Sequence, residues 1–330
     1  MRPSRCSSAI RIASATAALA AAPATRLVAQ GPENSGALFL EFPVGARAIG
    51  MGQAAVADGG RGEAAFWNPA GLAIIPGGGF ELHTGTLAAG RSHAVTAYFP
   101  SARIGVFGGA VYLVDYGDQE RIDSTNTTIA RISPRNFEFL ASFATALPGP
   151  ISIGLNYKLV SFRVDCSGDC TGFPNADGVT HALDVGGQFS VGAGDALRVG
   201  VALRNLGFRL QVENADQADP LPTSFVIGAQ WQAKLGTATA ADRFDLRVAA
   251  DVDNPWGESG TAALHFGADV GYKEIARVRA GYVARGGLAG PSVGLGFSTG
   301  SVAVDLARTF LTNSDLVVEN PTFFSFNLAF

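Results

Sequence analysis

The chain has 330 residues, of which 47% are hydrophobic and only 16% are charged, and its net charge at pH 7 is −4. Its mean hydropathy is +0.21. This composition argues against a disordered chain and gives no support to a nucleic-acid partner, but it is typical of a membrane protein. After the N-terminal region, no apolar run reaches the roughly 18 residues that a spanning helix needs. A closed β-barrel is then the remaining way to cross a bilayer.

Residues 1–29 have the layout of a secretory signal peptide. Three arginines among the first eleven residues form a basic start, and an alanine-rich apolar stretch follows over residues 12–22. Small residues after it permit cleavage, for which we favour Ala29. The alternative is an ordinary amphipathic helix, which the basic start and the alanine run make the weaker interpretation. We therefore expect export, with the mature protein in the outer membrane of a Gram-negative bacterium.

Residues 30–78 lack the alternation of the later chain. Glycine, alanine and proline dominate residues 45–52 and 68–73, so short helical turns and loops fit better than strands. Asn68 followed by Pro69 is typical of a helix start, with the proline at the first helical position. Because this segment is too apolar for a free tail and precedes the strands, we expect it to plug the lumen of a barrel. The candidate plug and ligand-binding residues are Asn68, Pro69, Ala70 and Gly71.

Over residues 79–330 the dominant period is two, as in β-strands with two different faces. In residues 151–159, for example, large apolar residues alternate with Ser152, Gly154, Asn156 and Lys158. We predict an all-β transmembrane antiparallel barrel of about fourteen strands: 79–88, 92–99, 102–115, 135–147, 151–165, 178–191, 196–212, 223–235, 243–254, 261–272, 275–285, 290–298, 301–309 and 322–330. A soluble β-sandwich also alternates, but full charges on the polar faces and segments of about ten residues favour a barrel around a watery lumen. The 42 glycines are expected to make room in that lumen.

Short and long connections roughly alternate between these strands. The short ones include 147–150, 192–195 and 299–300, and the long ones are 116–134, 166–177, 213–222 and 310–321. Outer-membrane barrels have short periplasmic turns and longer external loops. We therefore expect the long connections outside the cell and, with an even strand count, both chain ends in the periplasm.

Cys166 and Cys170 lie in one of the long connections. A redox or metal pair is one interpretation, but neither a further cysteine of the mature chain nor a nearby histidine completes a zinc site. A disulfide that staples the loop in an oxidising compartment is favoured, and it agrees with export.

The last predicted strand ends on an aromatic residue. Phe324, Phe326, Leu328 and the final Phe330 share one face. This arrangement resembles the signal that the barrel assembly machinery of the outer membrane recognises. A closing strand of a soluble barrel is the alternative, which the final position of Phe330 disfavours.

Charged residues on the polar faces form the second set of candidates. The lumen charges are Arg198, Arg204, Asp245, Arg247, Asp251, Arg277, Arg279 and Asp305. Cross-strand ion pairs are favoured over a pore that selects ions, because both signs are present. Four aromatic residues could form interfacial belts, namely Trp231, Tyr157, Tyr272 and Tyr282.

Signals for catalysis are weak. The four histidines are scattered without metal-ligand spacing. His265 shares a predicted lumen face with Asp269, which leaves a Ser-His-Asp arrangement open, but catalysis needs a full constellation. We expect no enzyme, no metal and no cofactor.

Residues 45–52 together with 68–73 resemble the N-terminal signature of PorV/PorQ-type outer-membrane proteins, relatives of the FadL long-chain fatty-acid transporters. Shorter matching pieces cover much of the mature chain: 205–207, 221–222, 278–282, 294–296 and 304–306. The resemblance implies a fourteen-stranded barrel with an N-terminal hatch.

The same resemblance implies two functions. In FadL-like barrels a hydrophobic molecule binds near the outside, displaces the plug and leaves through the barrel wall. PorV/PorQ proteins take part in protein export as components or shuttles of type IX secretion, in which case the loops 116–134 and 166–177 would bind proteins. A structural barrel with no transported substrate is a third possibility. Expected partners are outer-membrane lipid, the barrel assembly machinery, and either hydrophobic small molecules or secreted proteins.

Overall fold

The computed structural model describes residues 35–88, 90–172, 176–192, 195–212, 218–235, 244–256, 262–313, 316–317 and 320–330. The predicted signal peptide and its cleavage site lie outside the described residues, as do residues 30–34 of the expected plug. Within the described part of the chain, no helix is long and apolar enough to cross a membrane.

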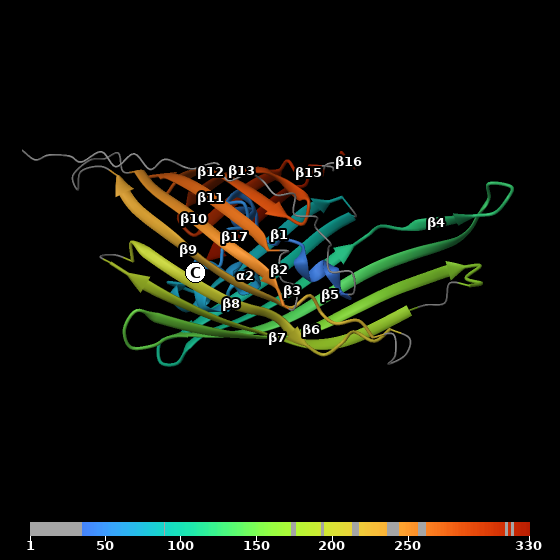
Figure 1. The fold of residues 1–330 in the computed structure, drawn as a ribbon, viewed down its shortest axis with the longest axis horizontal. Helices are drawn as coiled ribbons and strands as arrows, with labels where there is room; N and C mark the ends of the chain where they lie inside the picture. Colours follow the sequence, from blue (N-terminus) through green and yellow to red (C-terminus); the bar gives the residue numbers. More distant parts are fainter. Residues whose placement is uncertain are drawn as a thin grey trace, which may run out of the picture.

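Most of the chain forms a closed antiparallel β-barrel, as predicted (Figure 1). Fourteen strands make the wall: β1 (Gly79–Leu87), β2 (Gly90–Ser101), β3 (Gly105–Asp115), β5 (Thr128–Ala146), β6 (Ile151–Gly168), β7 (Ala176–Val191), β8 (Leu197–Gly207), β9 (Ser224–Leu235), β10 (Phe244–Pro255), β11 (Ala263–Tyr272), β12 (Ala276–Arg285), β13 (Leu288–Thr299), β14 (Val302–Thr309) and β17 (Thr322–Ala329). Because β1 pairs with both β2 and β17, the sheet closes on itself. Three short strands lie in the connections: β4 (Gln119–Ile122), β15 (Thr312–Asn313) and β16 (Leu316–Val317).

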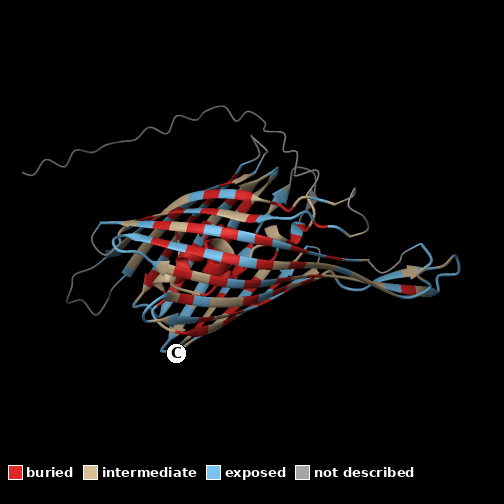
Figure 2. Cartoon of the chain, turned by 90° about the horizontal axis from the view of Figure 1, so that it is seen from below, coloured by how far each residue is buried: buried red, intermediate tan, exposed pale blue. Residues whose placement is uncertain are grey.

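The wall has an apolar outer face and a polar inner face. In β6, Leu155 and Tyr157 are exposed, whereas Asn156 and Lys158 are buried. Figure 2 shows this alternation as buried and exposed bands along the strands. Successive side chains of a strand point to opposite faces, so the exposed apolar residues form the outer belt that an outer-membrane barrel presents to lipid.

The two ends of the barrel differ. At one end, here called the turn end, residues 102–104, 273–275 and 300–301 make short connections, and the final Phe330 lies there beside Gly78. At the other end, the loop end, the longer connections follow β3, β6, β8 and β14. Short and long connections therefore alternate only roughly, as predicted, because two-residue connections at 88–89 and 286–287 also lie at the loop end.

The N-terminal segment passes through the whole lumen. Residues 35–78 contain η1 (Leu38–Glu41), α1 (Ala46–Gly50), α2 (Ala64–Trp67) and η2 (Pro69–Ile74). The amide of Gly36 donates to the carbonyl of Pro220 at the loop end, and the carbonyl of Gly78 accepts from Phe330 at the turn end. The first described residues thus lie at the loop end; the N-terminal end itself lies outside the described residues, so the prediction that both chain ends are in the periplasm stays a prediction. The even strand count was right, but the plug crosses the lumen once before β1 begins.

The predicted loop 116–134 is largely sheet. β5 begins at Thr128 and pairs with β4 and β6, so these strands extend past the barrel as a projection (Figures 1 and 2). Pro134 lies inside β5, where its carbonyl accepts from the amide of Tyr116. Pro134 lies between the end of the β3–β5 ladder at Arg135 and the start of the β4–β5 ladder at Ile132. A proline, which has no N–H to donate, is tolerated at such an interruption.

Glycines of the wall let the plug backbone approach closely. A Cβ atom on Gly281 of β12 would lie 2.0 Å from the amide nitrogen of Gly52, and one on Gly200 of β8 would lie 2.1 Å from the carbonyl oxygen of Val56. No side chain fits at such distances. The wall glycines thus serve the packing of the plug.

Replacing Gly281 with valine should displace the plug while the barrel still forms. We expect faster proteolysis within residues 35–78, together with an unchanged heat-dependent gel shift of the folded barrel. The control is Gly109→Val on the outer face of β3, where the nearest neighbour of a Cβ is 3.7 Å away. A plug that stays equally protected in both variants would contradict this account.

Candidate functional site

Asn68 joins the plug to the wall. Its side-chain nitrogen donates to the carbonyls of Val56 at 2.7 Å, Gly187 of β7 at 3.2 Å and Val201 of β8 at 3.3 Å. Its side-chain oxygen accepts from the amide of Ala70 at 3.0 Å, which caps the start of η2 as the sequence predicts. Asn68 is fully buried, so all of these contacts are shielded from bulk water.

The other three candidate plug residues are buried as well. Pro69 opens η2 and packs on β6, where a Cβ atom on Gly154 would lie 2.3 Å from the carbonyl carbon of Pro69. Ala70 and Gly71 follow in the same turn. In this conformation a ligand from outside reaches these residues only after the plug moves.

Two wall carboxylates bind backbone amides of the plug. One oxygen of Asp251 in β10 accepts from the amides of Ala55 at 2.7 Å and Val56 at 2.8 Å. Glu81 of β1 accepts from Gly62 at 2.9 Å and Glu63 at 2.7 Å. Asp251 was expected to pair with arginine, but the structure directs it to the plug. Sequence reasoning missed Glu81, although alternation along β1 places it on the lumen face.

Arg47 ties together two parts of the plug. Its guanidinium contacts Asp58 at 2.8 Å and Glu63 at 2.6 Å. Burial alone would raise the pKa of the Asp58 carboxyl, but the neighbouring Arg47 brings that pKa below its usual value. The plug therefore contains buried ion pairs of its own.

A row of alternating charges runs from the plug along the inner wall. We call it the charge ladder, and its members in order of contact are Arg61, Asp305, Arg279, Asp269, Arg277, Asp245 and Arg247. The side chain of Arg279 is completely buried and contacts Asp305 at 2.6 Å and Asp269 at 2.7 Å. Buried charges persist only when paired. The ladder therefore accounts for five of the predicted lumen charges.

The remaining predicted arginines lie apart from the ladder. Arg204 pairs with Asp253 at 2.5 Å, and Arg285 contacts the same carboxylate at 3.2 Å. Arg198 lies 3.8 Å from Asp195 at the turn end. Alternation along the strands predicts that these side chains face the lumen, but it does not identify their ion-pair partners.

A second buried cluster lies where the wall is irregular. Lys158 contacts Glu138 and Asp184, each at 3.0 Å, and donates to the side-chain oxygen of Asn205 at 2.8 Å. The register between β7 and β8 shifts at Asp184, and Asn205 there has a φ of 57°. Arg204 and Asn205 thus form a β-bulge opposite Asp184, in which asparagine tolerates the positive φ.

Apolar side chains fill the loop end of the lumen. This loop-end apolar cluster includes Phe39, Val44, Tyr112, Val114, Val160, Leu210 and Leu221 as buried members, with Phe42 and Phe66 packed against them. Phe39 comes from the plug, whereas Tyr112 comes from β3, and their ring centres are 6.3 Å apart. The loop end of the lumen is therefore mainly apolar, and a second apolar cluster, with Leu72, Tyr98 and Val106, lies nearer the turn end on the side of β2, β3 and β5.

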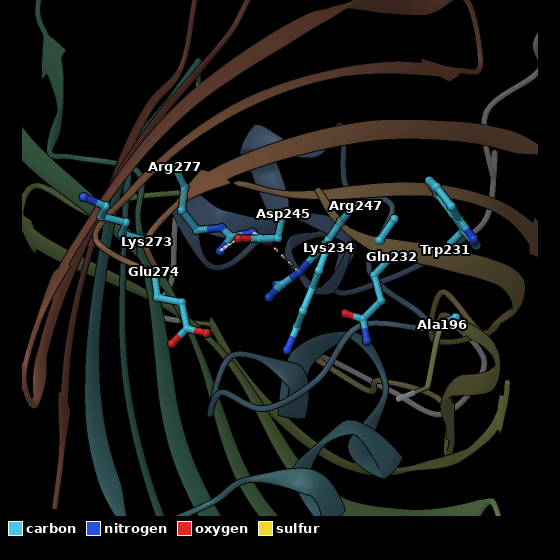
Figure 3. A pocket seen from close by; sticks show the side chains of 10 residues that line it. Ala196, Trp231, Gln232, Lys234, Asp245, Arg247, Lys273, Glu274 and Arg277 are labelled. Atoms are coloured by element: carbon cyan, nitrogen blue, oxygen red, sulfur yellow. Dashed lines mark hydrogen bonds and ion pairs between the residues drawn. The ribbon is translucent and has the colours of Figure 1, made fainter. Parts of the chain in front are cut away.

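A cavity of about 770 Å³ lies at the turn end, and we call it the turn-end cavity (Figure 3). Charged and polar side chains line it, among them Gln232, Lys234, Asp245, Arg247, Glu274 and Arg277. The last three members of the charge ladder, Arg277, Asp245 and Arg247, thus line the turn-end cavity.

No group of three or more metal-ligating side chains is close enough to hold a metal ion in the described ranges. His265 bonds to the carbonyl of Gly52 at 2.9 Å, and Asp269 is held by Arg277 and Arg279. The two residues are therefore not arranged as a catalytic pair.

The remaining predicted residues lie outside the lumen. Trp231, Tyr157 and Tyr282 are exposed on the outer face, and Tyr272 is partly buried at the turn end of β11. Cys166 and Cys170 form the predicted disulfide, which lies in the projection.

Replacing Asp251 with alanine should loosen the plug, because the amides of Ala55 and Val56 lose a charged acceptor. A hydrogen bond to a charged group contributes about 1.5–3 kcal/mol. We expect a larger conductance of the purified protein in planar bilayers than for the unmodified protein. The control is Asp177→Ala, an exposed aspartate of β7. Equal conductance in all three proteins would show that Asp251 does not hold the plug.

No family model and no curated protein match this sequence. Among solved structures, the toluene transporter TbuX of Ralstonia pickettii is similar, with a TM-score of 0.59 and 12% identity over 87% of this chain and 98% of that one. The toluene transporter TodX of Pseudomonas putida has a TM-score of 0.55 and 13% identity, covering 85% and 95%. The monoaromatic hydrocarbon channel CymD has a TM-score of 0.54 and 14% identity, covering 87% and 97%. At this identity the likeness shows the fold alone: the chain has the barrel fold of these transporters.

Proposed function

We propose that this protein is an outer-membrane channel for small hydrophobic molecules, with residues 35–78 as its gate. The observation that carries the proposal is the loop-end apolar cluster, which the plug and the wall build together. The cluster is buried where the plug meets the wall, so a hydrophobic molecule that enters from the loop end would bind there by replacing contacts between plug and wall. The fold likeness to transporters of toluene supports the same assignment.

Apolar burial supplies the driving force for binding. Removing about 150 Å² of an aromatic molecule from water gains about 4 kcal/mol at about 25 cal/mol per Å². Phe39 and Val44 belong to the plug, so a molecule that wedges between them and Tyr112 acts directly on the gate. Binding and opening would then be coupled through the same side chains.

The plug is the movable part in this proposal. Each wall strand described is hydrogen-bonded to both of its neighbours, so the wall has no break among these residues. By contrast, polar groups such as Asp251, Glu81 and Asn68 make the contacts between plug and wall. Water can replace such contacts when the plug shifts. We infer that the turn end faces the periplasm, because short turns lie there.

Uptake of radiolabelled toluene by cells of a Gram-negative host tests the proposal. Cells producing this protein should take up toluene faster than cells with an empty vector. Phe42→Gln places an amide in the apolar cluster. Burying an amide without a hydrogen-bond partner costs about 1–3 kcal/mol, so toluene should bind there more weakly and its uptake should fall about fivefold or more. Phe208→Gln is the control, since Phe208 is 75% exposed. Uptake equal to the empty vector, or equal in Phe42→Gln and the unmodified protein, would reject the channel.

A second candidate function is protein binding during export, which the projection favours. β4, β5 and β6 continue beyond the barrel, and the disulfide between Cys166 and Cys170 closes its tip region. The projection lies outside the barrel wall, so a channel for small molecules does not need it. The resemblance to PorV/PorQ proteins points the same way.

Shortening the projection separates the two functions. Replacing residues 118–131 with a tight turn should leave toluene uptake unchanged, because the loop-end apolar cluster lies within the barrel. If the protein also serves export, the same variant should lower the amount of secreted protein at the cell surface of its native host, measured by quantitative mass spectrometry. Unchanged secretion would remove the export function and leave the channel intact.

A further inference from the structure

The charge ladder ends with a surplus of positive charge at the turn-end cavity. Four arginines alternate with three aspartates along it. Both oxygens of Asp245 are hydrogen-bonded by Arg277, so the ion pair of Arg247 with Asp245 is long, at 3.9 Å. Asp58 and Asp269 attract Arg247 only through space. The side chain of Arg247 is only 28% exposed, which makes an unneutralised charge costly there.

A second cation lies beside it. In Figure 3 Arg247, Lys234 and Gln232 extend into the same part of the cavity, while Glu274 lies on the opposite side. Lys234 of β9 is exposed to this space. A guanidinium group can donate two parallel hydrogen bonds to phosphate oxygens, and a lysine ammonium beside it adds a second positive charge.

The cavity also reaches the lipid-facing side of the wall. It is lined by Trp231 and Ala233 as well as by Gln232 and Lys234, which alternate along β9 and so belong to its two faces. Leu197, the first residue of β8, pairs with Trp231. The amide of Gln232 still donates to the carbonyl of Ala196 at 2.8 Å, but β9 continues to Leu235, so the wall is shorter on the β8 side beyond Gln232.

We propose that the turn-end cavity binds the headgroup of an anionic membrane phospholipid. The phosphate lies between Arg247 and Lys234, and the acyl chains follow the outer face of β9 beside Trp231. Tryptophan favours this interfacial depth, and basic pockets near the membrane surface bind anionic headgroups. A cavity of about 770 Å³ is much larger than a free phosphate, which favours a phosphate carried by a larger molecule. This site goes beyond hydrophobic uptake and does not depend on it.

Native mass spectrometry of the full protein in zwitterionic detergent tests the site. With dioleoyl phosphatidylglycerol added, we expect one lipid to be retained by the unmodified protein. Lys234→Gln combined with Arg247→Gln should weaken retention about tenfold or more, since each charge contributes on the order of 1 kcal/mol near a membrane surface. The control is Arg103→Gln, an exposed arginine in the turn between β2 and β3. Circular dichroism and the heat-dependent gel shift verify that each variant is folded.

Competition separates a lipid from other ligands. Dioleoylglycerol, which lacks the phosphate, should not be retained, and inorganic phosphate at equal concentration should not displace phosphatidylglycerol. Displacement by inorganic phosphate would identify a free-anion site and overturn the lipid assignment. Equal retention by the double variant, or equal retention of dioleoylglycerol, would also overturn it. Toluene uptake does not enter these measurements, so failure of the channel function and failure of this site are distinguishable.

Discussion

Polar groups that are removed from water must find partners, and this constraint governs the interior of the barrel. The plug is built from short helical turns, so many of its backbone amides lack partners within the plug itself. Wall carboxylates and a buried asparagine provide them: Asp251 and Glu81 each accept from two consecutive amides, and Asn68 bonds to the carbonyls of two wall strands. The lumen side chains thus hold the plug in one position.

The same constraint explains why the lumen is so strongly charged yet nearly closed. The charges pair with each other in order along the wall, and every pair except Asp245 with Arg247, both of β10, joins different strands or joins a strand to the plug. The attraction within such a buried pair is largely offset by the cost of removing both charges from water. The pairs therefore fix the positions of strands and plug more than they add stability. Apolar residues of the plug and the wall pack together at the loop end and, on the side of β2, β3 and β5, also nearer the turn end. A gate whose contact at the loop end is apolar can respond to a hydrophobic ligand.

The charge ladder ends at the turn-end cavity. Arg247 is the terminal charge and lies at a cavity that borders both the lumen and the outer side of β9. A bound headgroup there would complete the pairing that the protein leaves unfinished.

The sequence by itself determined the period-two strands, their number, the apolar outer face, the short and long connections, the plug and the disulfide. These are local properties, because alternation, helix starts and cysteine spacing act over a few residues. The tertiary structure alone decided which charges meet, since the partners of Arg279 come from β11 and β14 and are brought close by strand register. It also decided that Asp251 holds the plug, that Asn205 forms a bulge against Asp184, and that Pro134 fits within β5. Each of these outcomes depends on a contact between segments far apart in the chain, and no local pattern encodes the register that creates it.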